Sequence, residues 1–371
     1  MSGKERICFV LTSAYGYFEP SVEAVGGGAR QLSFISRELT DTFDVHFVVG
    51  DYGQPRTEQV DGVTLHRAYS PSPDTSPLRK PLQLLKLLRA MRAANADIYV
   101  YRGRPYQAAI IYALTRLLDG KWVYNLANDP NIGEQPAALS PWMRKLFVRA
   151  LHDATTVITQ TNGQATKLQA EYGIQSTVIP SGYPEADDIS GHDEREYVLW
   201  VGRLDPKQKR PHLYLDLAAA CPDVSFVMIG PEGQDEQYNQ RIADRVRELE
   251  NLDYLGSVDP AHIHEYYREA IALVSTAAFE GFPSTFLEAW RYETPVVSLD
   301  VKVSRFANLS EYEGDADGDF ETLVELTRLL VSSPAARSRL SQPTSDHFTE
   351  NLTLAQVVSQ YRSTLERALA A

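Results

Sequence analysis

The apolar residues of this chain fall into two recurring patterns. Short apolar runs bounded by Gly, Pro, Asn or Asp predict buried strands, and apolar residues that recur every three or four positions predict amphipathic helices. In the first half, the predicted strands are 7–11, 45–49, 98–101, 122–126, 156–159 and 177–179. The predicted helices of this half are 79–93, 105–118, 141–152 and 162–172, with an earlier one after the glycines at 26–28.

The same alternation begins again in the second half. Its predicted strands are 197–201, 224–229, 272–275 and 295–299. Its predicted helices are 211–220, 236–249, 260–269 and 285–292, followed only by helices at 320–331, 334–341 and 353–369. Apolar strands that alternate with helices indicate a parallel sheet covered on both faces. The chain is therefore predicted to be an α/β protein with two doubly wound, Rossmann-like domains.

A segment between the two halves, 181–195, is rich in Gly, Pro and acidic residues and poor in apolar ones. This composition predicts an interdomain linker. We expect an N-terminal domain over 1–184, a second domain over 185–351, and a final helix in 352–371 that packs back on the N-terminal domain. Ligands of open parallel sheets bind beyond the carboxyl ends of the strands, so we expect the site in a central cleft between the domains.

The most informative segment follows the predicted strand 272–275 and reads EGFPSTFLE from Glu280 to Glu288. A helix is expected to begin near Thr285, and the N–H groups and dipole of a helix start favour an anion. Glu288 can accept hydrogen bonds from two neighbouring hydroxyls, which suits a ribose. Either acid taken alone is more simply an exposed loop or helix residue. The whole pattern after a buried strand favours a ligand site.

A second segment, 201–211, follows the strand 197–201 and reads VGRLDPKQKRP. Its four basic residues occupy eight positions: Arg203, Lys207, Lys209 and Arg210. Arginine presents a planar fork to phosphate oxygens, and lysine adds a mobile point charge. A solvated basic loop is the simpler alternative. However, residues 187–371 hold 17 Lys+Arg against 32 Asp+Glu, a balance of −15, and a basic segment in such surroundings favours an anionic ligand.

These two segments together resemble the C-terminal domain of retaining glycosyltransferases with the GT-B fold, specifically glycosyltransferase family 4 (glycosyl transferases group 1). The resemblance extends over nearly the full length, since the glycines at 26–28 resemble the glycine-rich loop of the family and 154–180 resembles its crossing into the linker. It implies a GT-B architecture and transfer of a sugar from a UDP- or GDP-linked donor, with no further cofactor.

Position by position, the resemblance implies that Arg203 and Lys209 bind the donor diphosphate and that Glu280 contacts the transferred sugar. These three are the implied catalytic residues, and Glu288 would hold the nucleotide ribose. The remaining implied donor contacts come from Gly27, Gly28, Gly202, Gly230, Ser284, Thr285 and Phe286.

The sequence departs from the family pattern in both domains. Lys209 lies six positions after Arg203, where five is usual, so Lys207 is a rival phosphate-binding lysine. Asn128 and Asp129 stand where the family often has a histidine. They are candidate sugar or acceptor contacts, although Asn-Asp-Pro is equally typical of a turn.

Two further departures lie in the second half. Pro283 replaces the second glycine of the family and removes one backbone N–H. Residues 301–306 stand where a glycine-rich stretch commonly follows Pro-Val-Val.

The resemblance implies a retaining reaction in which the leaving phosphate takes the proton of the acceptor. Positive charge from Arg203, Lys209 and the helix start near Thr285 would stabilise the leaving group, so we expect no metal. No Asp-x-Asp follows a predicted strand, and the acidic segment 315–319 lacks the rest of a calcium loop.

The overall charge is −13, from 36 Lys+Arg and 49 Asp+Glu, which argues against a nucleic-acid partner. No signal-peptide core or long apolar run is present, which favours a cytoplasmic protein. The basic, leucine-rich segments 78–92 and 141–149 are typical of helices that lie on anionic membranes, although a leucine face also serves to pack a helix on its sheet. We expect weak contact with the inner face of a membrane and a glycan or lipid-linked acceptor.

Two other functions remain open at this stage. A sugar-nucleotide epimerase can share the double-domain fold, and it would convert its substrate without an acceptor. A non-catalytic protein that binds nucleotide sugars or glycans is the other alternative.

Overall fold

The computed structural model describes residues 3–22, 26–70, 80–259 and 262–371. Their contacts divide the chain into two compact units. Unit 1 comprises Met1–Gly182 and Leu354–Ala371, and unit 2 comprises Tyr183–Thr353. Each unit contains one sheet with helices around it, as the apolar pattern predicts.

The sheet of unit 1 has eight strands in the order β3-β4-β2-β1-β5-β6-β7-β8. Seven of them run parallel, and β3 alone pairs antiparallel, with β4. The strands are β1 (Arg6–Val10), β2 (Asp44–Val49), β3 (Thr57–Val60), β4 (Val63–Arg67), β5 (Ile98–Arg102), β6 (Lys121–Asn125), β7 (Thr156–Thr159) and β8 (Thr177–Val178).

The hairpin of β3 and β4 is absent from the predicted elements. Its strands are largely polar, so they lack the apolar runs on which the prediction rests. Its signal is the two-residue turn Asp61-Gly62, whose φ angles are 50° and 81°. Asp-Gly is typical of the turn that joins adjacent antiparallel strands, because both of its residues adopt positive φ.

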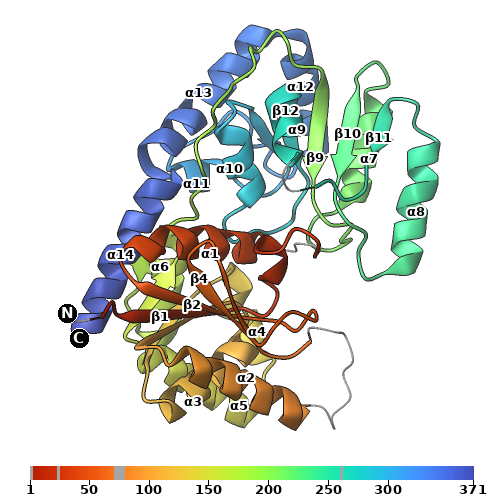
Figure 1. Ribbon diagram of the computed structural model, residues 1–371. Coiled ribbons are helices and arrows are strands. Elements are labelled where there is room, and N and C mark those ends of the chain that lie inside the picture. Colours follow the sequence, from red (N-terminus) through yellow and green to blue (C-terminus); the bar gives the residue numbers. More distant parts are fainter. Residues whose placement is uncertain (1–2, 23–25, 71–79, 260–261) are drawn as a thin grey trace. The chain divides into compact units, whose positions relative to one another are not determined.

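Helices cover both faces of this sheet (Figure 1). They are α1 (Gly27–Glu38), α2 (Lys80–Ala94), α3 (Pro105–Leu117), α4 (Glu134–Ala137), α5 (Pro141–His152), α6 (Asn162–Tyr172) and α14 (Leu354–Ala370), with short 3-10 turns at Tyr15–Tyr17, Leu39–Asp41 and Asp129–Asn131. Alternate residues of β1 enter opposite cores, since successive side chains of a strand point to opposite faces. Phe9 packs with α1 and α14, and Cys8 packs with α2, α3 and α5.

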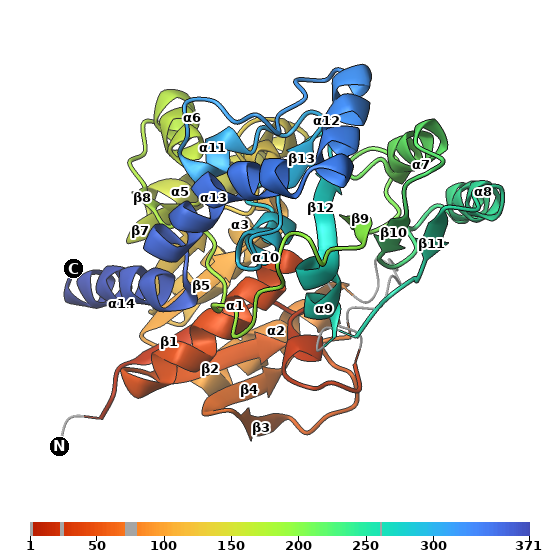
Figure 2. The same ribbon diagram turned by 90° about the horizontal axis from the view of Figure 1, so that it is seen from above.

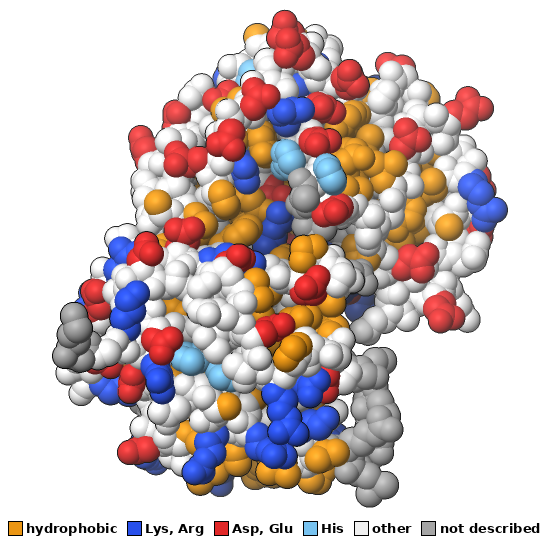
Figure 3. Space-filling view, in the orientation of Figure 1, with side chains coloured by type: hydrophobic (Ala, Val, Ile, Leu, Met, Phe, Trp, Pro, Cys, Tyr) orange, Lys and Arg blue, Asp and Glu red, His pale blue; other side chains and the backbone are white. Residues whose placement is uncertain are grey.

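Helix α2 buries only part of its apolar surface. Leu87 and Met91 enter the core, whereas Leu82, Leu84 and Leu85 are 54%, 44% and 50% exposed. On α5, Trp142 is 65% exposed. Figure 3 shows hydrophobic side chains beside Lys and Arg in the region of α2. Packing on the sheet therefore explains only the C-terminal half of α2.

The sheet of unit 2 has five parallel strands in the order β11-β10-β9-β12-β13. They are β9 (Tyr197–Val201), β10 (Phe226–Ile229), β11 (Leu252–Tyr254), β12 (Ala270–Ser275) and β13 (Val296–Ser298). From β9 the chain continues to β10 on one side, and it later returns to β12 on the other side. The topological switch point, where ligands of such sheets bind, therefore lies between β9 and β12.

The helices of unit 2 surround this sheet (Figure 2). They are α7 (Pro211–Ala220), α8 (Glu236–Arg247), α9 (Ile263–Glu269), α10 (Ser284–Trp290), α11 (Ser304–Ala307), α12 (Phe320–Ser332) and α13 (Pro334–Asn351). The start of the predicted helix 260–269 falls on residues 260 and 261, which lie outside the described residues.

The prediction that a helix ends at residue 341 is wrong, because α13 continues through Pro343 to Asn351. Proline lacks the N–H that would bond one turn back, at a typical cost of ~3 kcal/mol. The buried residues continue past Pro343 at helical spacing, to Thr344 and Phe348. Burial of this face offsets the lost hydrogen bond.

Candidate functional site

Two loops leave the carboxyl ends of neighbouring strands in unit 2. Residues 202–210 join β9 to α7, and residues 276–283 join β12 to α10. Because β9 and β12 are paired and parallel, both loops lie at the same edge of the sheet, at its switch point. The two segments that the sequence singles out therefore meet here.

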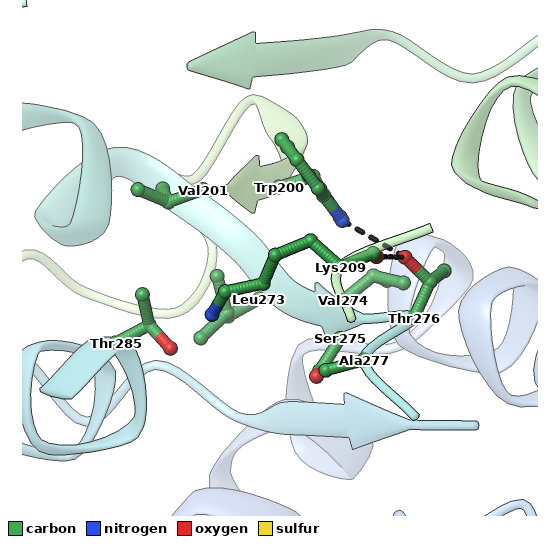
Figure 4. Close-up of a pocket in the computed structure, with 9 residues that line it drawn as sticks. All are labelled: Trp200, Val201, Lys209, Leu273, Val274, Ser275, Thr276, Ala277 and Thr285. Atoms are coloured by element: carbon green, nitrogen blue, oxygen red, sulfur yellow. Dashed lines mark hydrogen bonds between the residues drawn. The ribbon is translucent and has the colours of Figure 1, made fainter. Parts of the chain in front are cut away.

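Lys209 and Glu280 form the central contact of the site. The Nζ of Lys209 lies 2.5 Å from Oε1 of Glu280, and the two side chains are 22% and 12% exposed. Lys209 and Thr285 also line a small pocket at the ends of β9 and β12, and Figure 4 shows the lysine ammonium pointing toward Thr285. The structure thus brings three predicted site residues together.

Several hydrogen bonds hold the two loops against each other. The hydroxyl of Thr276 donates to the carbonyl of Lys209 over 2.7 Å and accepts from the indole N–H of Trp200 over 3.0 Å (Figure 4). The backbone N–H of Ala278 donates to the carbonyl of Gln208 over 2.8 Å. Lys209 and Glu280 therefore sit on loops of fixed relative position.

Asp205 organises the first of these loops. Its Oδ1 accepts from the backbone N–H groups of Lys207 and Gln208 at 2.9 and 2.8 Å. Although burial raises the pKa of Asp205, the hydrogen bonds from Gln208 and then Lys207 bring it below its usual value. The carboxylate also lies 3.4 Å from Nη2 of Arg203, whose side chain is 45% exposed. Arg203 is therefore held only loosely, at the solvent-exposed edge of the site.

The basic residues of this loop differ in their partners. Arg203, Lys209 and Arg210 pair with Asp205, Glu280 and Asp300 respectively. Lys207 is exposed. The basic segment is thus largely neutralised within unit 2, and Lys209, unlike its rival Lys207, contacts another predicted site residue.

Arg210 and Thr276 were not predicted as site residues. Arg210 adopts a positive φ of 49° and donates from Nε to the carbonyl of Thr276 over 2.7 Å. Its place in the basic segment pointed to a functional role, but its role in holding the two loops together emerges only from its contact with Thr276, the residue after β12. The sequence around Thr276 carries no such signal.

Helix α10 presents its residues in different ways. Phe286 is fully buried and packs its ring against Phe306 and Trp290, so only its backbone is available to a ligand. Glu288 is 4% exposed. Ser284 and Thr285 begin the helix, where the N–H groups have no intrahelical acceptor.

Gly202 and Gly230 lie against each other at the ends of β9 and β10. A Cβ on Gly230 would stand 1.8 Å from the carbonyl oxygen of Gly202. Gly230 also has a φ of +145°, which disfavours any side chain. Close backbone packing by itself therefore explains why residue 230 is a glycine.

Two further predicted residues lie in unit 1, at the start of α1. Gly26 is its N-cap, with a φ of 93°, and Gly27 and Gly28 form its first turn. A Cβ on Gly28 would lie 3.4 Å from Nε of Arg102, the last residue of β5. No pattern in the sequence indicates that Arg102 lies beside this turn.

The remaining candidates, Asn128 and Asp129, take part in a local turn of unit 1. The amide oxygen of Asn131 accepts from the backbone N–H of Asn128 over 3.1 Å, and Oδ1 of Asp129 accepts from the side chain of Gln164 over 3.0 Å. These contacts correspond to the turn interpretation of the sequence.

Neither a metal cluster nor a membrane span was found in the part of the chain that the structure describes. No group of three or more His, Cys, Asp or Glu there could hold a metal ion. No described helix is long and apolar enough to cross a membrane. The acids of the segment 315–319 have separate roles: Asp315 accepts from Ser304, Asp317 pairs with Lys302, and Asp319 caps α12.

Comparison with solved structures shows the same fold in proteins of low sequence identity. A sucrose-phosphate synthase from Thermosynechococcus elongatus matches with a TM-score of 0.78 and 18% identity over 99% of this chain and 100% of that one. Anabaena HepE in complex with UDP and glucose gives a TM-score of 0.73 and 16% identity over 98% and 99%. S. aureus TarM, in a complex with UDP and alpha-GlcNAc-glycerol, gives 0.62 and 14% over 76% and 58%.

Two family descriptions match the sequence and together span most of it. Residues 25–186 match "Glycosyltransferase Family 4", and residues 183–342 match "Glycosyl transferases group 1". These matches confirm the predicted family, and the structural neighbours confirm the predicted fold. The chain is a member of glycosyltransferase family 4 and has the GT-B fold.

Proposed function

We propose that this glycosyltransferase moves a hexosyl group from a UDP- or GDP-linked sugar to a glycan or lipid-linked acceptor, with retention of the anomeric configuration. The observation that carries the proposal is the Lys209–Glu280 pair at the switch point of the unit 2 sheet. A uridine donor is the first choice, because structures of the similar HepE contain UDP and UDP-glucose.

The pair combines the two groups that a sugar diphosphate requires. A carboxylate accepts hydrogen bonds from sugar hydroxyls, and an ammonium attracts phosphate oxygens. Without a ligand, Lys209 and Glu280 satisfy each other. In the proposed complex the diphosphate takes the ammonium and the sugar hydroxyls take the carboxylate, with Arg203 as a second cation and Glu288 on the ribose.

In the proposed reaction, the acceptor oxygen attacks the anomeric carbon from the face from which the nucleoside diphosphate leaves. The bond from that carbon to the phosphate oxygen breaks, the new glycosidic bond forms, and the acceptor proton passes to the leaving phosphate. Lys209, Arg203 and the N–H groups at the start of α10 stabilise the charge that develops on the diphosphate. These groups supply positive charge without a metal ion.

We further propose that unit 1 contacts anionic membranes weakly, at the cytoplasmic face. The support is the exposed apolar part of α2, with Lys80, Lys86 and Arg89 on the same helix, and the exposed Trp142 on α5. Exposed leucines and tryptophan next to cations are typical of surfaces that lie at the headgroup level.

The decisive experiment incubates the protein with a panel of nucleoside-diphosphate sugars and acceptors and determines the product anomer by NMR. Transfer with an anomer that matches the donor supports the proposal, and an inverted anomer contradicts the retaining mechanism. Conversion of the sugar nucleotide without an acceptor would indicate an epimerase. Binding of UDP or GDP without turnover under any condition would indicate a binding protein.

A further inference from the structure

Arg210 has a backbone conformation that its place in the sequence disfavours. It is the N-cap of α7, and its φ and ψ angles of 49° and 54° lie in the left-handed region that glycine occupies most readily. Pro211 follows it, and the residue before a proline favours an extended backbone. A residue keeps such a conformation only where the surrounding structure holds it there, and such residues cluster at functional sites. The contacts of Arg210 explain how this conformation is kept.

The guanidinium of Arg210 joins three loops at one edge of the unit 2 sheet. Arg210 itself lies on the loop after β9. Its Nε donates to the carbonyl of Thr276, after β12, over 2.7 Å, and its Nη2 pairs with the carboxylate of Asp300, after β13. Strands β9, β12 and β13 are neighbours in the sheet and run parallel, so their carboxyl ends lie side by side. Arg210 thus spans the end of β12 and links the loops on either side of it.

Asp300 is itself held in place by backbone packing. The backbone N–H of Leu299 donates to the carbonyl of Ser275, the last residue of β12, over 2.9 Å. Gly318 lies against the carboxylate, since a Cβ there would be 3.3 Å from Oδ1 of Asp300. The side chains of Arg210 and Asp300 are 22% and 37% exposed, so their pair is better shielded than a typical surface ion pair. Asp300 is thus a fixed anchor for the guanidinium.

These contacts fix the backbone of Lys209, the residue before Arg210. The hydroxyl of Thr276 donates to the carbonyl of Lys209 over 2.7 Å (Figure 4). The backbone N–H groups of Lys209 and Arg210 both donate to the carbonyl of Asp205, at 3.2 and 2.8 Å. Thr276 therefore binds Lys209 through its hydroxyl and Arg210 through its carbonyl. With its backbone held on both sides, Lys209 places its ammonium against Glu280.

We propose that Arg210 and Asp300 are positioning residues, which hold Lys209 where it meets the donor diphosphate and do not touch the donor themselves. This role rests on the proposed function, in which Lys209 binds that diphosphate. The planar fork of an arginine can bond Thr276 and Asp300 at the same time, whereas a lysine would offer a single point charge. The cations of the basic segment therefore differ in role, since Lys209 binds the ligand and Arg210 fixes the loop.

The test is a double-mutant cycle on nucleotide binding. UDP and GDP are the probes, titrated calorimetrically into the full chain. We expect Arg210→Gln and Asp300→Ala each to weaken the binding of nucleotide by about three- to tenfold. In a chain that also carries Lys209→Ala, the same substitutions should change affinity less than about twofold, because positioning residues act only through Lys209. An equal loss of affinity with and without Lys209 would overturn the proposal.

Two further variants test the geometry of the contact. Arg210→Lys keeps the charge without the fork, so it should bind nucleotide as weakly as Arg210→Gln. Wild-type affinity in Arg210→Lys would contradict the proposal. Arg245→Gln is the matched control, because it breaks an ion pair of 2.8 Å with Asp216 between α8 and α7 of the same unit. It should bind nucleotide as the wild type does.

Transfer assays with the same variants separate this role from the proposed function. We expect kcat to fall by about tenfold in Arg210→Gln and Asp300→Ala, with the acceptor KM changed less than about twofold. A wild type that binds nucleotide but transfers no sugar contradicts the proposed function alone. Wild-type nucleotide affinity in both variants contradicts the positioning role alone. Thermal melts establish that each variant is folded, and Asp300→Ala, which shortens a partly exposed side chain, decides the question if Arg210→Gln is not.

Discussion

The ammonium of Lys209 and the carboxylate of Glu280 lie 2.5 Å apart, on two loops that follow neighbouring strands. They are 71 residues apart in sequence. Their contact depends on the pairing of β9 with β12 and on the hydrogen bonds of Thr276, which join the loops. Both side chains are largely shielded from water, at 22% and 12% exposure.

Removal of either partner should abolish most of the transfer activity. We expect Glu280→Gln and Lys209→Ala each to lower kcat by ~100- to 1,000-fold, the usual effect of deleting a group that stabilises the transition state. Steady-state kinetics with the best donor measures this. Lys207→Ala is the control and should retain near-normal kcat, because Lys207 is exposed and contacts no other predicted site residue. A larger loss in Lys207→Ala than in Lys209→Ala would reverse the assignment of the phosphate lysine.

Thr276→Val should loosen the site without removing any charged group. The substitution keeps the shape of the side chain but leaves the indole N–H of Trp200 and the carbonyl of Lys209 without their partner. We expect a loss of ~1–3 kcal/mol in the free energy of unfolding, measured by urea denaturation. Thr285→Val is the matched control, and an equal loss there would show that the bridge of Thr276 has no special role.

A buried histidine pair in unit 1 should make stability depend on pH. His46 and His66, on β2 and β4, place their ring nitrogens 2.8 Å apart. Burial, and then His46, lower the pKa of His66 to about 4. The unfolded chain binds a proton near pH 6.5 and the folded chain does not, so this contribution to stability is complete above pH 6.5 and is lost as the pH falls toward 4.

The measurement is urea denaturation of the wild type and His66→Gln between pH 4 and pH 7.5. The variant should lose less stability than the wild type over the acid part of this range. His152→Gln, at an exposed position, should follow the wild type. Parallel pH profiles for all three proteins would contradict the assignment to His66.

Membrane contact should depend on charge and on the exposed leucines of α2. We expect the wild type to float with vesicles rich in anionic lipid at low salt, and not with neutral vesicles. Reversal of Lys80, Lys86 and Arg89 to Glu should abolish flotation. The control replaces Arg241, Arg247 and Arg339 of unit 2 with Glu, which changes the net charge by the same amount. Flotation that is equal in both triple variants would exclude a specific surface on α2.

Chelation of metal ions should leave transfer intact. Lys209 and Arg203 supply the positive charge proposed to stabilise the leaving diphosphate, so EDTA should change kcat less than twofold. The assay compares EDTA-treated enzyme with enzyme supplied with Mg²⁺ or Mn²⁺. A large stimulation by either ion would contradict a metal-independent mechanism.

The alternation of apolar strands and amphipathic helices was sufficient to predict two doubly wound domains, because burial on both faces requires such runs wherever the strand lies. It missed the hairpin at Asp61-Gly62, whose strands are largely polar, and it ended α13 at residue 341, although the helix continues through Pro343. The pattern from Glu280 to Glu288 and the basic segment before Pro211 could likewise be recognised as candidate site segments, since each is a short continuous stretch of sequence.

The sequence alone therefore determined the family, the class of fold and the loops that hold the candidate donor site. Only the tertiary structure decided which charges meet. It paired Lys209 with Glu280 and assigned Arg210 to Thr276 and Asp300. The reason is physical: local periodicity reports whether a side chain is buried, whereas its partner depends on strand order and on loops that are distant in sequence.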